Sequence, residues 1–423
     1  MKPFPTNDII NIMIKFPKDF LWGAATSSYQ VEGNNKNADW WQWEKKAGKV
    51  QSGDACRHYE LYEQDFDIAQ SLNHNAHRIS IEWSRIESKE GQFSQKELQH
   101  YIDVILALKR RNLEPIVTLH HFTNPLWFSK KGGWVNPHSV KYFLRYSEFV
   151  VKALSKYVHY WITINEPTIY ISHSYIFGAW PPQERSIIKA TQVEENLAYA
   201  HVQAYCLIHK IYKKMKLYEP AVSIAQNVMA FVPCTRELKN RLAAYLRDKV
   251  YNLGFLERIM RSNVLRRKPL DFIGINYYSR QLVAVKELGV GNLAMDVCNV
   301  KQQYIKKNSL GWDIYPKGLL EILLELKNYD LPIMITENGI CTSDDKQRWK
   351  YIYDHLKCVG LAMKEGVVVT GYLYWSLMDN FEWDKGFSPR FGLVDINYNT
   401  YKRTVRKSAK KFAQICRTGI LSK

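Results

Sequence analysis

Short apolar segments, rich in β-branched and aromatic residues, alternate along this chain with amphipathic stretches of helical periodicity. Apolar runs of this length are typical of strands that are buried on both faces. No Pro-, Gly- or Ser-rich linker interrupts the alternation, so it predicts one closed parallel sheet and not two domains. The expected fold is a single-domain (β/α)8 TIM barrel of the α/β class. Its eight strands are expected at residues 20–25, 77–81, 115–119, 161–165, 221–225, 272–277, 333–337 and 368–375.

The length of 423 residues alone is compatible with two or three domains of average size. A single barrel with long loops reaches the same length, so the strand pattern decides between the two. We expect residues 1–15 to form an N-terminal extension and residues 16–423 to form the barrel. Nothing repeats at a fixed period, which excludes a solenoid. In a TIM barrel the active site lies at the C-terminal ends of the strands.

Several of the stretches between the expected strands carry helix start signals. Two of them have the Ser/Thr-x-x-Glu spacing of a capping box, one has Asn followed by Pro as N-cap and first residue, and one opens with Pro. The expected starts are Ser94 with Glu97, Asn136 with Pro137, Thr191 with Glu194, and Pro316.

Neither a membrane span nor secretion is expected. The uncharged run at residues 366–378 is shorter than the roughly 20 residues that a spanning helix needs. At the N-terminus, Asp8 and two asparagines break up any signal-peptide core. The seven cysteines are odd in number and form no C-x-x-C pair. A disulfide framework is therefore not expected, and a reducing, cytoplasmic location is favoured.

The charge balance is strongly basic, with 59 Lys and Arg against 41 Asp and Glu and a net charge of +18. A nucleic acid or a membrane surface therefore has to be considered as a partner. The basic residues, however, occur in short scattered clusters without glycine or interleaved aromatic residues. This pattern favours solvated outer faces of helices. We expect no nucleic-acid and no membrane partner, whereas a homo-oligomer is possible.

Two of the expected strands end in a carboxylate next to an asparagine. Glu166 follows Asn165 at the end of the fourth strand, and Glu337 precedes Asn338 at the end of the seventh. Because these strands lie on opposite sides of an eight-membered ring, the two carboxylates can converge over its mouth. A lone Glu is usually a cap or a surface ion-pair partner. Two facing carboxylates are what glycoside hydrolysis requires, one to protonate the leaving oxygen and one to meet the oxocarbenium-like carbon.

Four motifs together resemble glycoside hydrolase family 1, the retaining β-glucosidase family. They are WGAATSSYQVEG at 22–33, TINEP at 163–167, ITENG at 335–339 and WSLMDNFEW at 375–383, and the resemblance extends from about residue 16 to residue 413. It implies a retaining β-glycosidase that hydrolyses terminal, unphosphorylated β-D-glucosides by double displacement through a covalent glycosyl-enzyme. It extends to β-D-galactosides or β-D-fucosides as substrates, and it implies no metal and no organic cofactor.

The resemblance also assigns roles to individual residues. Glu166 corresponds to the general acid/base and Glu337 to the nucleophile. Asn165 corresponds to the partner of the sugar 2-hydroxyl, and Arg78 and Tyr278 to the residues that keep the nucleophile ionised, which we expect to give it a low pKa. The residues that correspond to the sugar-binding site are Gln30, His121, Trp375, Glu382, Trp383 and Phe391.

Three positions bear on specificity. Members of the family that act on 6-phospho sugars replace the Glu382–Trp383 pair with a Ser, and a carboxylate would repel a phosphate. Unphosphorylated sugars are therefore favoured, with a 6-phospho-β-glycosidase or a β-mannosidase as the alternatives. Phe122 stands where many members have Trp, which removes an indole donor. Glu82 lies on the same strand face as Arg78 and either perturbs the nucleophile or pairs with another buried group.

Other interpretations are weaker. The stretch Gly289-Val-Gly291-Asn-Leu-Ala294 matches G-x-G-x-x-A, but no amphipathic helix opens there and it lies outside a βαβ unit. His120 and His121 could suggest a metal pair, yet neighbouring strand residues point to opposite faces. A non-catalytic sugar-binding protein on the same barrel is a remote alternative, because fold alone does not prove activity. A retaining enzyme should hold its two carboxyl groups about 5–5.5 Å apart.

Overall fold

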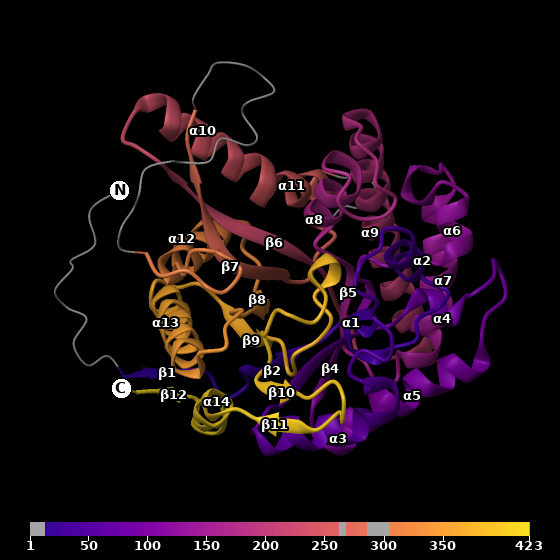
Figure 1. The fold of residues 1–423 in the computed structure, drawn as a ribbon, viewed down its shortest axis with the longest axis horizontal. Coiled ribbons are helices and arrows are strands. Elements are labelled where there is room, and N and C mark those ends of the chain that lie inside the picture. The colour runs from indigo at the N-terminus through magenta and orange to yellow at the C-terminus, as the bar shows by residue number, and fades with distance from the viewer. Residues whose placement is uncertain (1–12, 262–267, 286–304, 423) are drawn as a thin grey trace.

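The computed structural model describes residues 13–261, 268–285 and 305–422. Within this part of the chain, eight parallel strands close into a barrel in the order in which they occur in the sequence. The expected fold is confirmed (Figure 1). The barrel strands are β2 (Leu21–Ala25), β3 (Ala76–Ser80), β4 (Glu114–His120), β5 (Tyr160–Asn165), β6 (Ala221–Pro233), β7 (Ile273–Val283), β8 (Ile333–Asn338) and β9 (Val369–Trp375).

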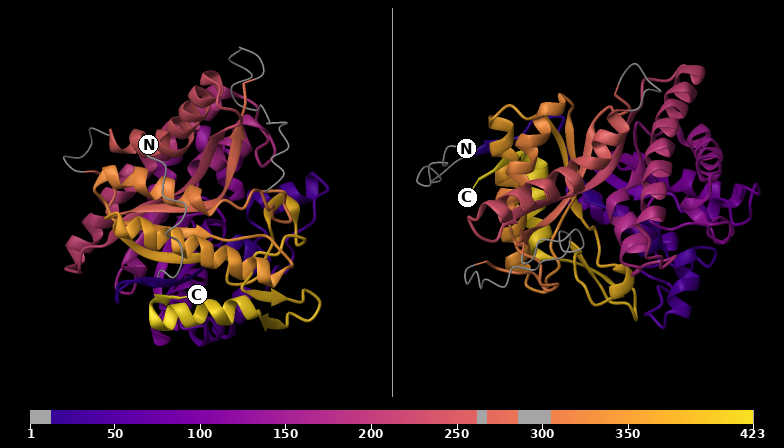
Figure 2. Two further views of the ribbon diagram at one scale, coloured as in Figure 1. Left: turned by 90° about the vertical axis from the view of Figure 1, so that its left-hand side faces the viewer. Right: turned by 90° about the horizontal axis from the view of Figure 1, so that it is seen from above.

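The helices surround the barrel, as Figures 1 and 2 show from three sides. Most of them bury an apolar face against the strands or against a neighbouring helix, which is the usual two-layer solution for this fold. The helices are α1 (Ser28–Glu32), α2 (Asp39–Lys46), α3 (His58–Ser71), α4 (Trp83–Ile86), α5 (Gln95–Arg110), α6 (Leu126–Lys130), α7 (Ser139–Leu154), α8 (Pro167–Ile171), α9 (Ile187–Met215), α10 (Leu238–Asp248), α11 (Gly254–Met260), α12 (Pro316–Leu326), α13 (Asp345–Lys364) and α14 (Lys407–Thr418).

Two barrel strands run further than the sequence pattern predicts. β6 and β7 were expected to end at residues 225 and 277, but their pairing continues until Pro233 lies opposite Val283. Beyond the barrel rim the strands are only partly buried, so their side chains no longer form a continuous apolar run. This extension carries α10 on one side, at the upper edge of Figure 1.

Two of the four expected helix starts are confirmed. Ser94 caps α5 and accepts a hydrogen bond from the backbone N–H of Glu97 at 3.2 Å. Pro316 is the first residue of α12. Its missing N–H costs nothing there, because the first N–H groups of a helix have no partner within the helix.

The other two starts are wrong. Asn136 does not cap α7; its side chain accepts from the backbone N–H of His138 at 2.7 Å. This local turn delays the helix to Ser139. α9 begins before Thr191, because Ser186 caps it by accepting from the backbone N–H of Lys189. Thr191 therefore lies inside the helix.

Two short antiparallel sheets complete the chain. β1 (Ile14–Lys15) pairs with β12 (Ile420–Leu421), and β10 (Val394–Ile396) pairs with β11 (Arg403–Val405). The described helices include none that is long and apolar enough to cross a membrane. Four cysteines are free thiols, but Cys234 is disulfide-bonded, which corrects the expectation of a chain without disulfides. The free thiols are Cys56, Cys341, Cys358 and Cys416.

Candidate active site

A cavity of about 230 Å³ opens at the C-terminal ends of the barrel strands. Ten of the eleven site residues expected from the sequence line it, and the eleventh, Arg78, lies buried beneath it. The structure thus brings together side chains that are more than 350 residues apart in the chain. The ten are Gln30, His121, Asn165, Glu166, Tyr278, Glu337, Trp375, Glu382, Trp383 and Phe391.

Glu166 occupies a special backbone conformation between β5 and α8. Its φ is 44° and its ψ 58°, in the left-handed region that non-glycine residues seldom adopt. Pro167, which follows it, starts α8 and disfavours a right-handed helical conformation at Glu166. Backbone strain of this kind clusters at functional sites. Here it turns the chain sharply at the end of β5 and leaves the carboxyl group of Glu166 at the cavity.

The carboxyl group of Glu166 has amide donors and no cation as hydrogen-bond partners. Its Oε1 accepts from the Nδ2 atoms of Asn227 and Asn276, each at 2.8 Å. Burial raises the pKa of Glu166 to about 8, and the charge of Glu337 adds to this effect. Glu166 is therefore protonated at neutral pH, as a general acid has to be.

Glu337 has a different set of partners. Its Oε1 accepts from Nη1 of Arg78 at 2.6 Å, and its Oε2 accepts from the hydroxyl of Tyr278 at 2.5 Å. Burial nevertheless raises the pKa of Glu337 above its ordinary value, while Arg78 and Tyr278 act in the opposite direction. The expectation of a low pKa is thus wrong in its net direction, although both expected contacts are present. With a guanidinium and a phenol as partners, Glu337 keeps its charge more readily than Glu166.

Arg78 connects Glu337 to the asparagine at the end of β5. Its Nη2 donates to Oδ1 of Asn165 at 2.6 Å, and its Nε donates to Thr118 at 3.0 Å. Nδ2 of Asn165 then lies 3.2 Å from Nε2 of His121. Because Oδ1 is already engaged by Arg78, the amide of Asn165 is held with its N–H groups toward the cavity side.

Asn276 is a hydrogen-bond partner of both Glu166 and Glu337. Its Nδ2 donates to Glu166 and also lies 3.1 Å from Oδ1 of Asn165, and it is a hydrogen-bond partner of Glu337. One amide therefore touches both carboxyl groups. The strand pairing shifts register next to Asn165 and Asn276, and such irregularities re-aim side chains beside active sites.

The last turn of the ITENG segment depends on glycine. A Cβ atom at Gly339 would lie 1.9 Å from the carbonyl oxygen of Trp375. No side chain fits at that distance, so the close approach of β8 to the end of β9 requires glycine. This approach places Glu337 and Trp375 on neighbouring strands of the same cavity wall.

The opposite wall presents polar groups and flat rings. Nε2 of Gln30 donates to the carbonyl oxygen of Phe381 at 2.8 Å and lies 3.4 Å from a carboxyl oxygen of Glu382. The ring of His121 lies nearly parallel to Trp375 and to Trp383, with centroids 6.1 and 6.0 Å apart. Polar groups beside apolar rings are suited to a sugar, which has a hydroxyl rim and C–H faces.

Burial and two neighbouring acids perturb Glu382. Its pKa is raised to about 8, first by burial and then by the charges of Glu337 and Glu166. Three glutamates thus share one cavity with Asp384, and Arg78 pairs with only one of these four carboxyl groups. At neutral pH, Glu382 and Glu166 hold protons and can donate hydrogen bonds to a ligand.

Phe122 lines the cavity and offers no donor. Its φ is 71°, and Trp383 has a φ of 49°, so two large side chains of this wall have left-handed backbones. The ring of Phe122 packs 5.2 Å from both Trp180 and Trp383. The position where many family members have Trp is therefore filled by a ring that only contributes apolar contact.

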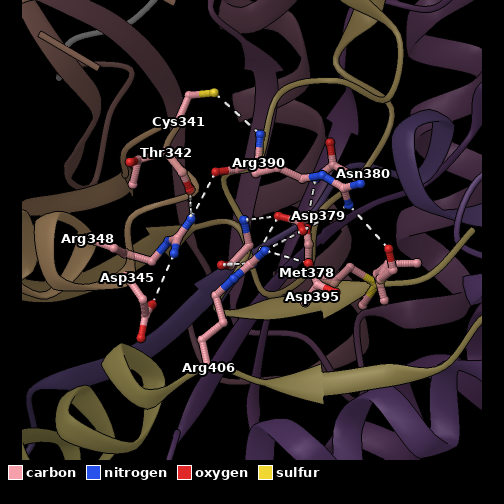
Figure 3. A network of polar contacts seen from close by, with 12 residues as sticks. Cys341, Thr342, Asp345, Arg348, Met378, Asp379, Asn380, Arg390, Asp395 and Arg406 are labelled. Atoms are coloured by element: carbon pink, nitrogen blue, oxygen red, sulfur yellow. Dashed lines mark hydrogen bonds and ion pairs between the residues drawn. The ribbon is translucent and has the colours of Figure 1, made fainter. Parts of the chain in front are cut away.

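The segment that carries Glu382 and Trp383 is held from below by a polar network (Figure 3). Asp379 is fully buried and accepts from Nη2 of Arg406 at 2.8 Å and from Nη1 of Arg390 at 3.2 Å. Its other oxygen accepts from the backbone N–H of Gly392 at 2.8 Å. The network joins both ends of the loop between β9 and β10 and so fixes the cavity wall that carries Glu382 and Trp383.

Replacing Asp379 by Asn should loosen this wall. The change removes a fully buried charge and leaves two partly buried guanidinium groups with less counter-charge, so we expect a loss of about 3 kcal/mol in the free energy of unfolding. KM for an aryl β-glucoside should rise several-fold, with a smaller change in kcat. Thermal unfolding and steady-state kinetics measure both effects. Asp395→Asn is the matched control, since Asp395 pairs with the same Arg406 but is half exposed; an equal loss in both variants would contradict the assigned role.

Glu82 does not reach the cavity. It lies beyond the end of β3, caps α4, and accepts hydrogen bonds from Ser84 at 2.7 Å and Thr123 at 2.9 Å. Burial raises its pKa to about 7. Of the two roles left open for it, the structure supports pairing with buried hydroxyl groups.

The remaining alternatives find little support. His120 points away from His121 and lies 3.0 Å from Oδ1 of Asn124. The described residues contain no cluster of His, Cys, Asp and Glu that could hold a metal ion. The G-x-G-x-x-A stretch at residues 289–294 lies outside the described residues.

Several cavity residues were missed by the sequence analysis. Asn227 and Asn276 contact Glu166. Asn276 lies within the apolar run 272–277 and Asn227 two residues after the run 221–225, which is a signal that a search for polar residues at strand ends would have found. The outer part of the cavity offers no such signal, because its residues come from loops and helix ends. These outer residues are Ile169, His173, Trp180, Leu310, Trp312, Asp384 and Lys385.

Comparison with known proteins decides the family. The model of the family described as Glycosyl hydrolase family 1 matches residues 12–263 and 260–419. The chain belongs to this family. It is 39% identical to a solved β-glycosidase from Pyrococcus horikoshii, with a TM-score of 0.89 and 97% of each chain covered.

Two further relatives bear on substrate and mechanism. A solved β-glucosidase from Thermotoga maritima, in complex with cyclophellitol, is 30% identical, with a TM-score of 0.86, and covers 96% of this chain and 99% of its own. A 6-phospho-β-galactosidase from Clostridium acetobutylicum is 32% identical over 95% of this chain and 97% of its own. The family resemblance and the class of glycoside hydrolase expected from the sequence are confirmed.

Proposed function

We propose that the protein is a retaining β-glycosidase that acts on terminal, unphosphorylated β-D-glucosides and also on β-D-galactosides or β-D-fucosides. One observation carries the proposal: Glu166 and Glu337 meet at one cavity with unequal partners. Glu337 pairs with Arg78 at 2.6 Å, whereas Glu166 has only amide donors. This asymmetry supports an ionised nucleophile beside a protonated acid.

In the first step, a carboxylate oxygen of Glu337 attacks the anomeric carbon and forms a glycosyl ester. The bond to the leaving oxygen breaks, and this oxygen takes the proton of Glu166. Asn165, oriented by Arg78, is placed to bond the sugar 2-hydroxyl, a contact that strengthens as the carbon becomes positive.

In the second step, Glu166 changes its role. Once Glu337 is esterified its charge is gone, and the pKa of Glu166 falls because one of its causes is removed. The carboxylate of Glu166 then takes a proton from water, whose oxygen attacks the anomeric carbon and releases Glu337. Two displacements at one carbon restore the starting β configuration.

The side chains at the sugar-binding wall support unphosphorylated substrates, because Glu382, protonated at neutral pH, is larger than a Ser and supplies no cation, and the pKa of Asp384 is lowered so that it stays charged. Glu382 stands where a phosphate-binding relative would have Ser, and Asp384 lies beside it. Lys385 also lines the cavity, but its ammonium group lies 2.8 Å from Asp384 and is thereby neutralised. One relative is a 6-phospho-β-galactosidase, so 6-phospho-β-galactosides are the second substrate class to test.

The test is the stereochemistry of hydrolysis. With an aryl β-glucoside, ¹H NMR should show the β-anomer of glucose before any α-anomer, and the α-anomer should grow only by mutarotation. First appearance of the α-anomer would contradict the retaining mechanism. The corresponding 6-phospho substrate, run in parallel, should be hydrolysed at least about a hundredfold more slowly, since each 1.4 kcal/mol of repulsion gives a factor of ten.

The value of kcat/KM should fall as the pH rises through about 8. Glu166 has its pKa raised to about 8, so it holds its proton below that pH and loses it as the pH rises. Glu382 has a similar pKa, so a variant has to separate the two groups. In Glu382→Gln the alkaline fall should remain. In Glu166→Ala, measured with an activated aryl substrate, it should disappear; a fall that persists there would contradict the assignment.

The location of the protein in the cell belongs to the proposal as well. We infer a cytoplasmic protein, because the chain keeps free thiols at Cys56, Cys341, Cys358 and Cys416 beside the disulfide-bonded Cys234. The substrate is a small β-linked disaccharide or an aryl or alkyl β-glycoside, and no cofactor takes part in the steps above.

A further inference from the structure

Helix α10 turns its large apolar side chains away from the protein. Leu238, Leu242, Tyr245 and Leu246 are between 46% and 77% exposed. Their spacing of four, seven and eight residues places them on one face of the helix. Val250, in the turn that follows, is 74% exposed as well. In an ordinary surface helix these residues would face the core.

The inner face of α10 is fixed by small and polar residues, so the orientation of the helix is well determined. Ala243 and Ala244 are buried and pack against Val283 of β7. Asn240 donates to Thr235 at 2.8 Å and accepts from the backbone N–H of Val285 at 2.7 Å. Rotation of the helix to bury the leucines would break these contacts.

Cations flank the apolar face. Lys239 and Arg241 are exposed and stand on either side of the stripe, about 75° and 85° from its centre at 100° per residue. Arg236 is exposed just before the helix. One of these positive charges is offset, because Glu237 pairs with Lys239. The surroundings of the stripe are therefore basic, in a chain whose net charge is +18.

We propose that α10 is an interfacial helix by which the protein associates with an anionic lipid bilayer. An apolar face of leucine and tyrosine with Lys and Arg at its edges is the composition that lies in the headgroup region of a membrane. Basic residues add attraction to anionic lipids, which are enriched in the cytoplasmic leaflet. This proposal differs from the expectation, based on scattered charge alone, that the protein has no membrane partner.

A second copy of the chain fits this surface less well. A stable interface uses about 20–30 residues a side, far more than the apolar residues of one 11-residue helix. Two copies would also bring their Lys239 and Arg241 side chains together, which is unfavourable. An anionic surface instead satisfies both the apolar stripe and its basic edges.

The position of α10 gives the association a consequence for catalysis. The helix follows the C-terminal end of β6 (Figure 1). It therefore lies at the same end of the barrel as the cavity, which opens at the C-terminal ends of the strands. From the turn after it, the hydroxyl of Tyr251 donates to Asn227, which in turn donates to Glu166. Association through α10 therefore holds the end of the barrel that carries the active site beside the bilayer.

Co-sedimentation with vesicles tests the proposal. The full-length protein should bind vesicles in which phosphatidylglycerol replaces part of the phosphatidylcholine, and bind poorly to phosphatidylcholine alone. The double variant Leu242→Ser/Leu246→Ser should lower the partition coefficient at least about tenfold, because each leucine loses buried CH₂ groups. Arg241→Gln should weaken binding and reduce its salt dependence. Circular dichroism and activity on a soluble aryl β-glucoside should be unchanged in all variants.

The control variant is Tyr218→Ser/Val368→Ser. Both residues are exposed apolar side chains, 94% and 61%, but they precede β6 and β9 and so lie at the opposite end of the barrel. Their loss should leave vesicle binding unchanged. Equal binding of the α10 and control variants, or no binding to anionic vesicles, would overturn the proposal. So would a dimer in sedimentation velocity that the α10 double variant abolishes, because the stripe would then be a contact between copies.

Discussion

Replacement of Glu337 by Ala should reduce kcat for β-glycosides by at least about four orders of magnitude, as expected for loss of a covalent nucleophile. Glu166 and Glu382 do not take its place, because they come from the end of β5 and from the loop after β9, whereas Glu337 stands on β8. The variant should still fold and bind sugar. It leaves Arg78 buried without its counter-ion, so the free energy of unfolding should fall by about 3 kcal/mol. Steady-state kinetics, equilibrium unfolding and titration with glucose measure these effects.

Chemical rescue gives this prediction a stereochemical readout. Azide or formate should enter the space left by the carboxylate and attack an activated β-glucoside directly. A single displacement inverts the anomeric carbon, so the azide product should be the α-glycosyl azide, identified by NMR. Glu87→Ala is a control for loss of a buried carboxylate paired with an arginine outside the cavity; it should lower stability and leave kcat nearly unchanged. Without added anion, a kcat of the Glu337 variant that falls by much less than about four orders of magnitude would contradict its role.

The barrel could be predicted from the sequence because each strand is buried on both faces and so reads as an apolar run. The positions of Glu166 and Glu337 followed from the same logic, since chain order alone places strands four and seven across the ring. The boundaries were less certain where local turn chemistry competes with helix formation, as at Asn136, whose side chain bonds the amide of His138. Likewise, β6 could not be seen to continue past residue 225, because its outer half loses the continuous burial that marks a barrel strand.

The electrostatics of the site could be predicted only in part. Arg78 and Tyr278 were expected to contact Glu337, and they do. Their effect on its pKa was overestimated, because the cost of burial depends on the whole surrounding structure and is not visible in a motif. For the same reason Glu82, on the same strand face as Arg78, could not be placed: the chain turns into α4 after β3 and carries it away from the cavity.

The residues that contact Glu166 show why part of the site stayed hidden. Asn227 and Asn276 come from β6 and β7, and neither belongs to a motif that carries the catalytic chemistry. Their amides surround the acid only because the pairing of β5, β6 and β7 shifts register at the rim. Such shifts are set by packing between strands, which a single sequence does not report.

Replacement of Glu166 by Ala should slow hydrolysis in a way that depends on the leaving group. A 2,4-dinitrophenolate leaves without help, so formation of the glycosyl-enzyme should change by less than about tenfold. Alkyl and unsubstituted phenyl β-glucosides need a proton on the leaving oxygen and should be slowed by about 10²–10⁴-fold, the usual contribution of a general acid. A plot of log kcat/KM against leaving-group pKa should therefore become steep. Equal slowing of all substrates would contradict the assignment of Glu166 as the acid.

The second step should be impaired in the same variant, and this separates it from the Glu337 variant. Without a base, water attacks the glycosyl-enzyme slowly, so the activated substrate should give a burst of one equivalent of phenolate followed by slow turnover. Azide needs no base and should restore turnover. Because Glu337 still performs the first displacement, the product should be the β-glycosyl azide, opposite to that of the Glu337 variant. An α-glycosyl azide would show that Glu166 does not act on the side of the sugar from which water attacks. The same conclusion would follow if a burst is observed but azide does not restore turnover.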